Sequence, residues 1–93
     1  MFVQALVELI GTFVFLSVIL STQGNAIAVG VALATAIYFG GSISGGHFNP
    51  AVTFMQTMNG KLEYSTALVY VIVQLIGAWS ALSFSRLVVN NSF

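Results

Sequence analysis

Three apolar stretches dominate the sequence, and each is long enough to cross a bilayer as a helix. A hydrocarbon core about 30 Å thick needs about 20 apolar residues of helix. The stretches run from about Val3 to Ser21, from about Asn25 to Gly41 and from about Tyr64 to Val88. Only 4% of the residues are charged, against about a quarter in a soluble domain. We therefore expect an all-α membrane protein, embedded in the lipid bilayer with three transmembrane helices.

The few charged residues argue against several classes of function. Lys61 and Arg86 balance Glu8 and Glu63, which leaves no basic patch for nucleic acid. The chain has no cysteine and a single histidine, His47, which is a poor basis for a metal site. Because the chain has only two acids, and Glu63 falls near a predicted membrane boundary, no pair of carboxylates for acid and base catalysis is expected. We expect no nucleic-acid partner, no cofactor and no enzymatic activity.

A short segment between the second and third stretches is predicted to be a helix that cannot cross the bilayer. Asn49 is a favoured N-cap, Pro50 suits the first helical position and Gly60 is a natural stop. A helix from Pro50 to Asn59 would be about 15 Å long, half the hydrocarbon thickness. Because it carries no charge, a re-entrant half-helix fits better than a helix at the aqueous surface.

The glycine-rich stretch from Gly40 to Phe48, before this half-helix, is expected to be non-helical. Such backbone is tolerated at membrane depth only where it is buried in protein or lines a watery cavity. The pattern therefore predicts a pore or a binding site. An ordinary capped helix after a glycine loop is the simpler alternative, because Asn-Pro is also a frequent turn signal.

The ten residues from Ser44 to Thr53, Ser-Gly-Gly-His-Phe-Asn-Pro-Ala-Val-Thr, resemble the first pore loop of the major intrinsic protein (aquaporin) family. The resemblance implies that residues 1–93 form a single aquaporin-like half repeat, with three transmembrane helices and one re-entrant half-helix. It also implies passive conduction of water or a small neutral solute. Family members ordinarily carry two inverted repeats, and these residues supply one. Outside the loop, the resemblance rests on Glu8, Gly11 and Thr12 in the first stretch and on Gln74, Gly77 and Ala78 in the third.

A half-helix that begins at mid-membrane points its positive dipole end at the passing solute and repels cations. If Asn49 caps the helix with its side-chain oxygen, its amide nitrogen is free to donate to water. The carbonyls of Gly45, Gly46 and His47 can accept hydrogen bonds along the same wall. For His47 we favour the backbone carbonyl over the ring. The expected pore-lining residues are Asn49, Pro50, Ala51, Gly45, Gly46, His47, Val29 and Val52, with Val29 placed by alignment to the family's filter position in the second helix.

Glu8 is a charged group inside a predicted span, where such groups usually face protein and have a partner. The family resemblance suggests that Glu8 and Gln74 are scaffold residues that hydrogen-bond the pore-loop backbone. The alternative for Glu8 is an interfacial side chain that reaches water near the start of the helix. Pairs of small residues are expected to pack helices closely, namely Gly30 with Ala34 and Gly77 with Ala81.

One copy of these helices cannot enclose a pore, because one side of the loop would face lipid with unsatisfied backbone groups. We therefore expect a homo-oligomer or a second half-channel as partner. Lys61 and Arg86 fall on opposite membrane faces, which permits an antiparallel, dual-topology homodimer. A parallel homo-oligomer and a partner half encoded on another chain remain open. A structural or assembly protein, whose vestigial loop does not conduct, is the alternative function.

Overall fold

The structure, a computed structural model, describes residues 1–91 and the side chains of residues 1–89. The chain forms α1 (Phe2–Thr22), α2 (Ala26–Ser44), α3 (Pro50–Met58) and α4 (Tyr64–Asn91). Three of these helices, α1, α2 and α4, are long and apolar enough to cross a membrane. With nine residues, α3 is too short to do so. These helices confirm the predicted fold class of three spans and one short helix.

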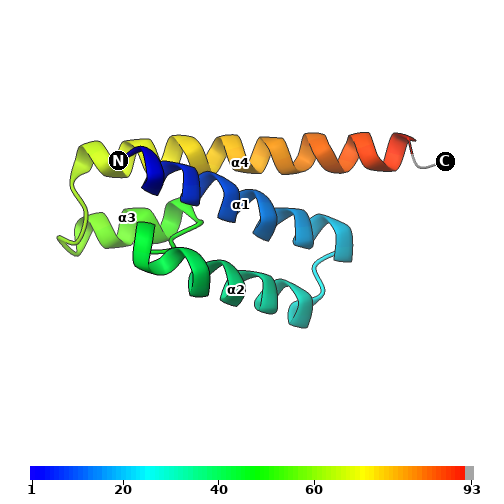
Figure 1. Ribbon diagram of the computed structural model, residues 1–93, viewed down its shortest axis with the longest axis horizontal. Helices are drawn as coiled ribbons and strands as arrows, with labels where there is room; N and C mark the ends of the chain where they lie inside the picture. Colours follow the sequence, from blue (N-terminus) through cyan, green and yellow to red (C-terminus); the bar gives the residue numbers. More distant parts are fainter. Residues whose placement is uncertain (92–93) are drawn as a thin grey trace.

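Figure 1 shows how the helices are arranged. The middle position belongs to α1, which packs against both α2 and α4, whereas α3 packs against α4 alone among the described helices. Helix α3 begins away from both ends of the molecule and ends at the same end as the N-terminus. The turn from α1 to α2 lies at the opposite end. The chain between α2 and α4 therefore enters the bundle and leaves it at the same end, as a re-entrant segment does.

Close packing of α1 on α4 depends on small residues of α4. A Cβ added to Gly77 would lie 2.9 Å from the Leu9 carbonyl oxygen, so only glycine allows the two backbones to approach this closely. One turn further on, Ala81 is fully buried. The prediction for Gly77 with Ala81 is confirmed. The prediction for Gly30 with Ala34 is wrong within one chain, because both residues are exposed and nothing lies within 4 Å of a Cβ on Gly30.

The second helix is longer than expected, which corrects the prediction that non-helical backbone begins at Gly40. It continues through Gly40 and ends at Ser44, where Gly45 adopts the left-handed conformation with φ 92°. Gly40 serves packing rather than flexibility, since an added Cβ would lie 2.8 Å from Val7 Cγ1 and 3.1 Å from Phe48 Cζ. The irregular segment is therefore limited to residues 45–49.

The predicted ends of the half-helix are close to those observed. Asn49 is the N-cap, with its Oδ1 accepting from the Ala51 amide at 2.8 Å, and Pro50 is the first helical residue. The helix ends at Met58, one residue earlier than expected, and Gly60 follows with φ 74°. Local capping chemistry therefore accounts for both ends of α3.

Candidate functional site

The loop that leads into α3 makes a tight reversal through left-handed backbone. Gly45 and Gly46 have φ values of 92° and 64°, which glycine adopts without a steric penalty. Phe48 has φ 53°, a conformation that costs a non-glycine residue about 1–2 kcal/mol. Phe48 is 2% exposed, and its ring lies against Gly11 of α1 and Gly40 of α2. Burial of this ring offsets the backbone strain and anchors the loop to two helices.

Glu8 of α1 is completely buried, and its carboxylate accepts four hydrogen bonds from the loop and its neighbours. Its Oε2 accepts from Ser44 Oγ at 2.7 Å and from the His47 amide at 3.0 Å. Its Oε1 accepts from the Phe48 amide at 2.8 Å and from Gln74 Nε2 at 2.9 Å. Hydrogen bonds to a charged acceptor are about twice as strong as neutral ones. The side chain therefore faces the protein interior and does not reach toward water.

Gln74 of α4 has a different set of contacts from the one expected. Its Nε2 donates to Glu8 Oε1 and, at 2.8 Å, to Thr53 Oγ1 of α3, and no loop backbone group is its partner. Its Oε1 is buried and has no hydrogen-bond partner among the described side chains and backbone. Gln74 therefore connects the Glu8 carboxylate to α3, and the prediction that it bonds the loop backbone is wrong.

The ring of His47 is held on two sides. Its Nδ1 lies 2.9 Å from Thr53 Oγ1, and the ring packs edge-on against Tyr70 with 5.2 Å between the ring centroids. The Tyr70 hydroxyl donates to the Ser44 carbonyl at 2.6 Å, which fixes the phenol in turn. The imidazole is therefore fixed by contacts with both α3 and α4.

Sequence reasoning missed three contributors to this cluster: Ser44, Thr53 and Tyr70. A helical stripe could have revealed Tyr70, because residues 70, 74, 77 and 81 follow the spacing of one helix face. All four are buried in the structure. Ser44 and Thr53 lay within the motif but had been given no role, because their partners come from other helices.

Hydrogen bonding in the loop separates its donors from its acceptors. The Gly45 amide donates to the Gly41 carbonyl, and the Gly46 amide donates to Ser44 Oγ; both acceptors lie in the last turn of α2. The next two amides bond to Glu8. Within residues 1–91, no donor reaches the carbonyl oxygens of Gly45, Gly46 or His47. Three consecutive carbonyl oxygens of the loop are thus left without a donor from the described residues.

The start of α3 offers the complementary donor. Asn49, Pro50 and Ala51 are exposed, and the Asn49 side-chain oxygen is engaged by the Ala51 amide. The side-chain nitrogen of Asn49, Nδ2, makes no hydrogen bond within the described part of the chain. A free side-chain donor therefore lies two residues after the last of the three free acceptors, with Phe48 between them.

The two valines predicted to shape a constriction are not brought together within one chain. Val52 is half-buried in the first turn of α3, next to Asn49. Val29 is half-buried near the start of α2, about 24 Å along the helix axis from Gly45. Helices α2 and α3 make no contact among the described residues. A role for Val29 and Val52 in selectivity remains a prediction.

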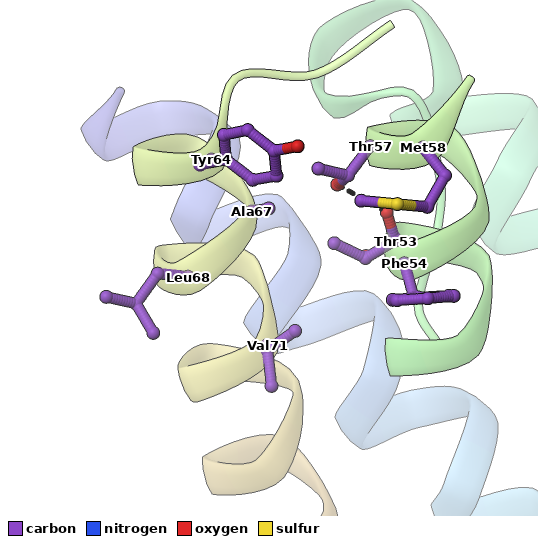
Figure 2. A pocket seen from close by; sticks show the side chains of 8 residues that line it. All are labelled: Thr53, Phe54, Thr57, Met58, Tyr64, Ala67, Leu68 and Val71. Carbon is purple, nitrogen blue, oxygen red and sulfur yellow. Dashed lines mark hydrogen bonds between the residues drawn. The ribbon is translucent and has the colours of Figure 1, made fainter. Parts of the chain in front are cut away.

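An apolar pocket of about 370 Å³ lies between α3 and the beginning of α4. Figure 2 shows Phe54 and Met58 of α3 on one side and Tyr64, Leu68 and Val71 of α4 on the other. The lining hydroxyls of Thr53 and Thr57 are both engaged in hydrogen bonds. This pocket therefore offers apolar packing surface and little to orient a polar solute.

Comparison with known proteins places these features in a family. The family model described as "Major intrinsic protein" matches residues 1–92. Glycerol uptake facilitator protein-like 6 of Lactiplantibacillus plantarum is 43% identical over 81 residues, which are 78% of this chain and 38% of that protein. Aquaporin Z of Brucella melitensis is 43% identical over 58 residues, covering 62% of this chain and 25% of the relative. The lens fiber major intrinsic protein of Ovis aries is 47% identical over 53 residues, 57% of this chain and 20% of that protein.

The chain thus spans less than half the length of these relatives. No solved structure matches it. The family match covers nearly every residue, and the three apolar helices are those of an integral membrane protein. The chain belongs to the major intrinsic protein family.

Proposed function

We propose that this chain forms part of a passive membrane channel for water or another small neutral solute, and that at least two copies assemble the conducting path. The observation that carries the proposal is the arrangement of free hydrogen-bonding groups at the loop. The carbonyl oxygens of Gly45, Gly46 and His47 have no donor, and they are followed along the chain by the free side-chain nitrogen of Asn49. A row of acceptors that ends at a donor can exchange hydrogen bonds with a water molecule at each step.

The half-helix supplies a barrier to cations at the same place. The N-terminus of α3 lies away from both ends of the bundle, and the helix dipole carries about half a positive charge there. Neither the loop nor α3 contains a charged residue that would neutralise this field. Neutral solutes can therefore bind the loop by hydrogen bonds, whereas cations meet a repulsive potential.

Unpaired groups on α3 and the loop support the need for a partner. Within the chain α3 contacts only α4, and Phe54, Met55 and Met58 are each more than half exposed. Carbonyl oxygens facing hydrocarbon without donors would cost several kcal/mol each. A second copy in the opposite orientation would bring a second Asn49 to mid-membrane and would surround the loops with protein. Glu8, with Gln74 behind it, is in this proposal the scaffold that holds the loop acceptors in position.

The Asn49→Asp variant tests the channel. Aspartate keeps an oxygen that can cap α3, but it replaces the free amide donor with a negative charge. We expect the osmotic water permeability of proteoliposomes to fall at least about threefold, because one hydrogen bond of about 1 kcal/mol to the solute is lost. Stopped-flow light scattering at matched protein density measures this, with glycerol permeability recorded in parallel.

Asn25→Asp provides a matched control for this experiment. Asn25 caps α2 through the same type of contact, with its Oδ1 accepting from the Ala28 amide at 2.9 Å, and the start of α2 lies at the end of the bundle away from α3. Its permeability is expected to equal that of the unchanged protein. Folded protein with no permeability above empty liposomes would contradict the channel and would favour a structural or assembly role.

Antiparallel assembly makes a separate prediction about topology. The chain has no cysteine, so Ser21→Cys, in the last turn of α1, and Asn59→Cys, directly after α3, each introduce one thiol. The end of α1 and the end of α3 lie at opposite ends of the bundle. Two copies in opposite orientations would make each thiol reactive toward a membrane-impermeant reagent in about half of the molecules. Complete labelling at one position with none at the other would show a single orientation and would rule out the antiparallel homodimer.

A further inference from the structure

The side chain of His47 has a free nitrogen that the loop's backbone chemistry does not use. Nε2 makes no hydrogen bond within the described residues. Unlike Gln74 Oε1, it is not sealed from solvent. The ring edge that carries Nε2 faces Gly45, where an added Cβ would lie 3.2 Å from Nε2. Gly45 is exposed and has a free carbonyl oxygen. The question is whether Nε2 carries a proton there.

The hydrogen bonds around His47 determine which ring nitrogen carries the proton, and the first of them involve Gln74. Its amide must present Nε2 to Glu8, because the reverse orientation would set the amide oxygen against a carboxylate that only accepts. The second Nε2 proton then goes to Thr53 Oγ1 at 2.8 Å. The Thr53 oxygen is therefore an acceptor toward Gln74.

Thr53 has one hydroxyl proton left to donate, and it is fully buried. Among the described residues, the acceptor within reach of this hydroxyl is His47 Nδ1, at 2.9 Å. If Nδ1 carried its own proton, the Thr53 hydroxyl would be buried without an acceptor, which is energetically unfavourable. Nδ1 is therefore the acceptor, and the single ring proton of the neutral imidazole resides on Nε2.

From this chain of contacts we propose that Thr53 is a positioning residue that fixes the tautomer of His47 and so presents Nε2–H to the solute beside the Gly45 carbonyl. The inference rests on the proposed channel function. In it, Glu8 and Gln74 act at a distance on the solute path, because their hydrogen bonds orient the Thr53 hydroxyl. Packing against Tyr70 keeps the imidazole from rotating away. The loop then offers a side-chain donor among its backbone acceptors.

The test combines the tautomer with transport. His47 is the one histidine of the chain, so labelling histidine with ¹⁵N gives ring signals that belong to a single residue. Solid-state NMR of the protein in lipid bilayers distinguishes protonated from unprotonated ring nitrogens. The unchanged protein is expected to show an unprotonated Nδ1 and a protonated Nε2. Thr53→Val, which removes the hydroxyl at nearly constant volume, is expected to show both tautomers and a threefold to fivefold lower water permeability.

Two further variants separate positioning from structural support. Thr53→Ser keeps the hydroxyl and is expected to restore the single tautomer and the permeability. Thr57→Val removes a hydroxyl one turn along α3 that bonds only to the Thr53 carbonyl, and it is expected to change neither readout. All variants are compared at equal helix content by circular dichroism.

Several outcomes would overturn the inference, and one of them bears on the proposed function instead. A proton on Nδ1 in the unchanged protein, or a Thr53→Val variant that loses permeability with its tautomer unchanged, would refute the positioning role while leaving the channel intact. A Thr53→Val variant with altered tautomer but full permeability would refute the solute contact. Impermeable vesicles of the unchanged, folded protein would overturn the proposed function and the solute contact together.

Discussion

Replacing Glu8 with alanine is expected to destabilise the protein by about 3–5 kcal/mol and to abolish permeability. The carboxylate accepts four hydrogen bonds, two of them from the backbone amides of His47 and Phe48. Those amides lie in a buried part of the loop, and each would cost about 1–3 kcal/mol without an acceptor. Glu8→Gln is expected to be nearly as harmful, because its amide nitrogen would face two of the four donors. Thermal unfolding in detergent, followed by circular dichroism, measures the loss of stability.

The second glutamate of the chain is the matched control for this prediction. Glu63 is exposed and lies in the turn between α3 and α4, outside the apolar spans. Glu63→Ala is expected to change stability by no more than about 0.5 kcal/mol, as is usual for surface substitutions. If both substitutions had the same small effect, the hydrogen bonds of Glu8 would not hold the loop in place.

Adding one methyl group at Gly11 is expected to cost about 1–3 kcal/mol or more. A Cβ at this position would overlap the Phe48 ring, with Cδ1 and Cζ both at 2.6 Å. The ring cannot retreat, because a Cβ on Gly40 would lie only 3.1 Å from its Cζ on the other side. Gly11→Ala is therefore expected to push Phe48 out of its site and to displace the loop it anchors, with loss of both stability and permeability.

Gly30→Ala is the control, since it makes the same change in a helix where an added Cβ meets open space. There the better helix propensity of alanine should leave the chain as stable, or up to about 1 kcal/mol more stable. Phe48→Leu combined with Gly11→Ala should recover part of the lost stability, because a smaller side chain relieves the overlap. Equal stability of the two alanine variants would show that Gly11 is not a packing requirement.

Much of the fold could be predicted from local sequence patterns. Apolar length predicted the three spanning helices, and the Asn49, Pro50 and Gly60 signals predicted α3 to within one residue at its end. The end of α2 was predicted wrongly because Gly40 and Gly41 look like a break. In the structure Gly40 stays helical, and its missing side chain makes room for Phe48.

The candidate site could be predicted only in part. Asn49 and the loop glycines belong to one short motif, and the hydrogen-bonding capacity of each residue in it follows from its chemistry. The partners of Glu8 and Gln74 could not be derived in this way, and Gln74 turned out to bond Thr53 instead of the loop backbone. The left-handed Phe48 was also beyond prediction, because local energetics disfavour that conformation.

By itself, the sequence determined that this chain lives in a bilayer, where its helices begin and which of them is too short to cross. These properties follow from hydropathy and from capping contacts between residues a few positions apart, so they need no knowledge of the fold. The tertiary structure decided which groups satisfy one another. The contacts of Glu8 join residues 36 to 66 positions away, and they exist only because α1, α4 and the loop pack together. Which loop atoms are left free for a solute follows from that packing.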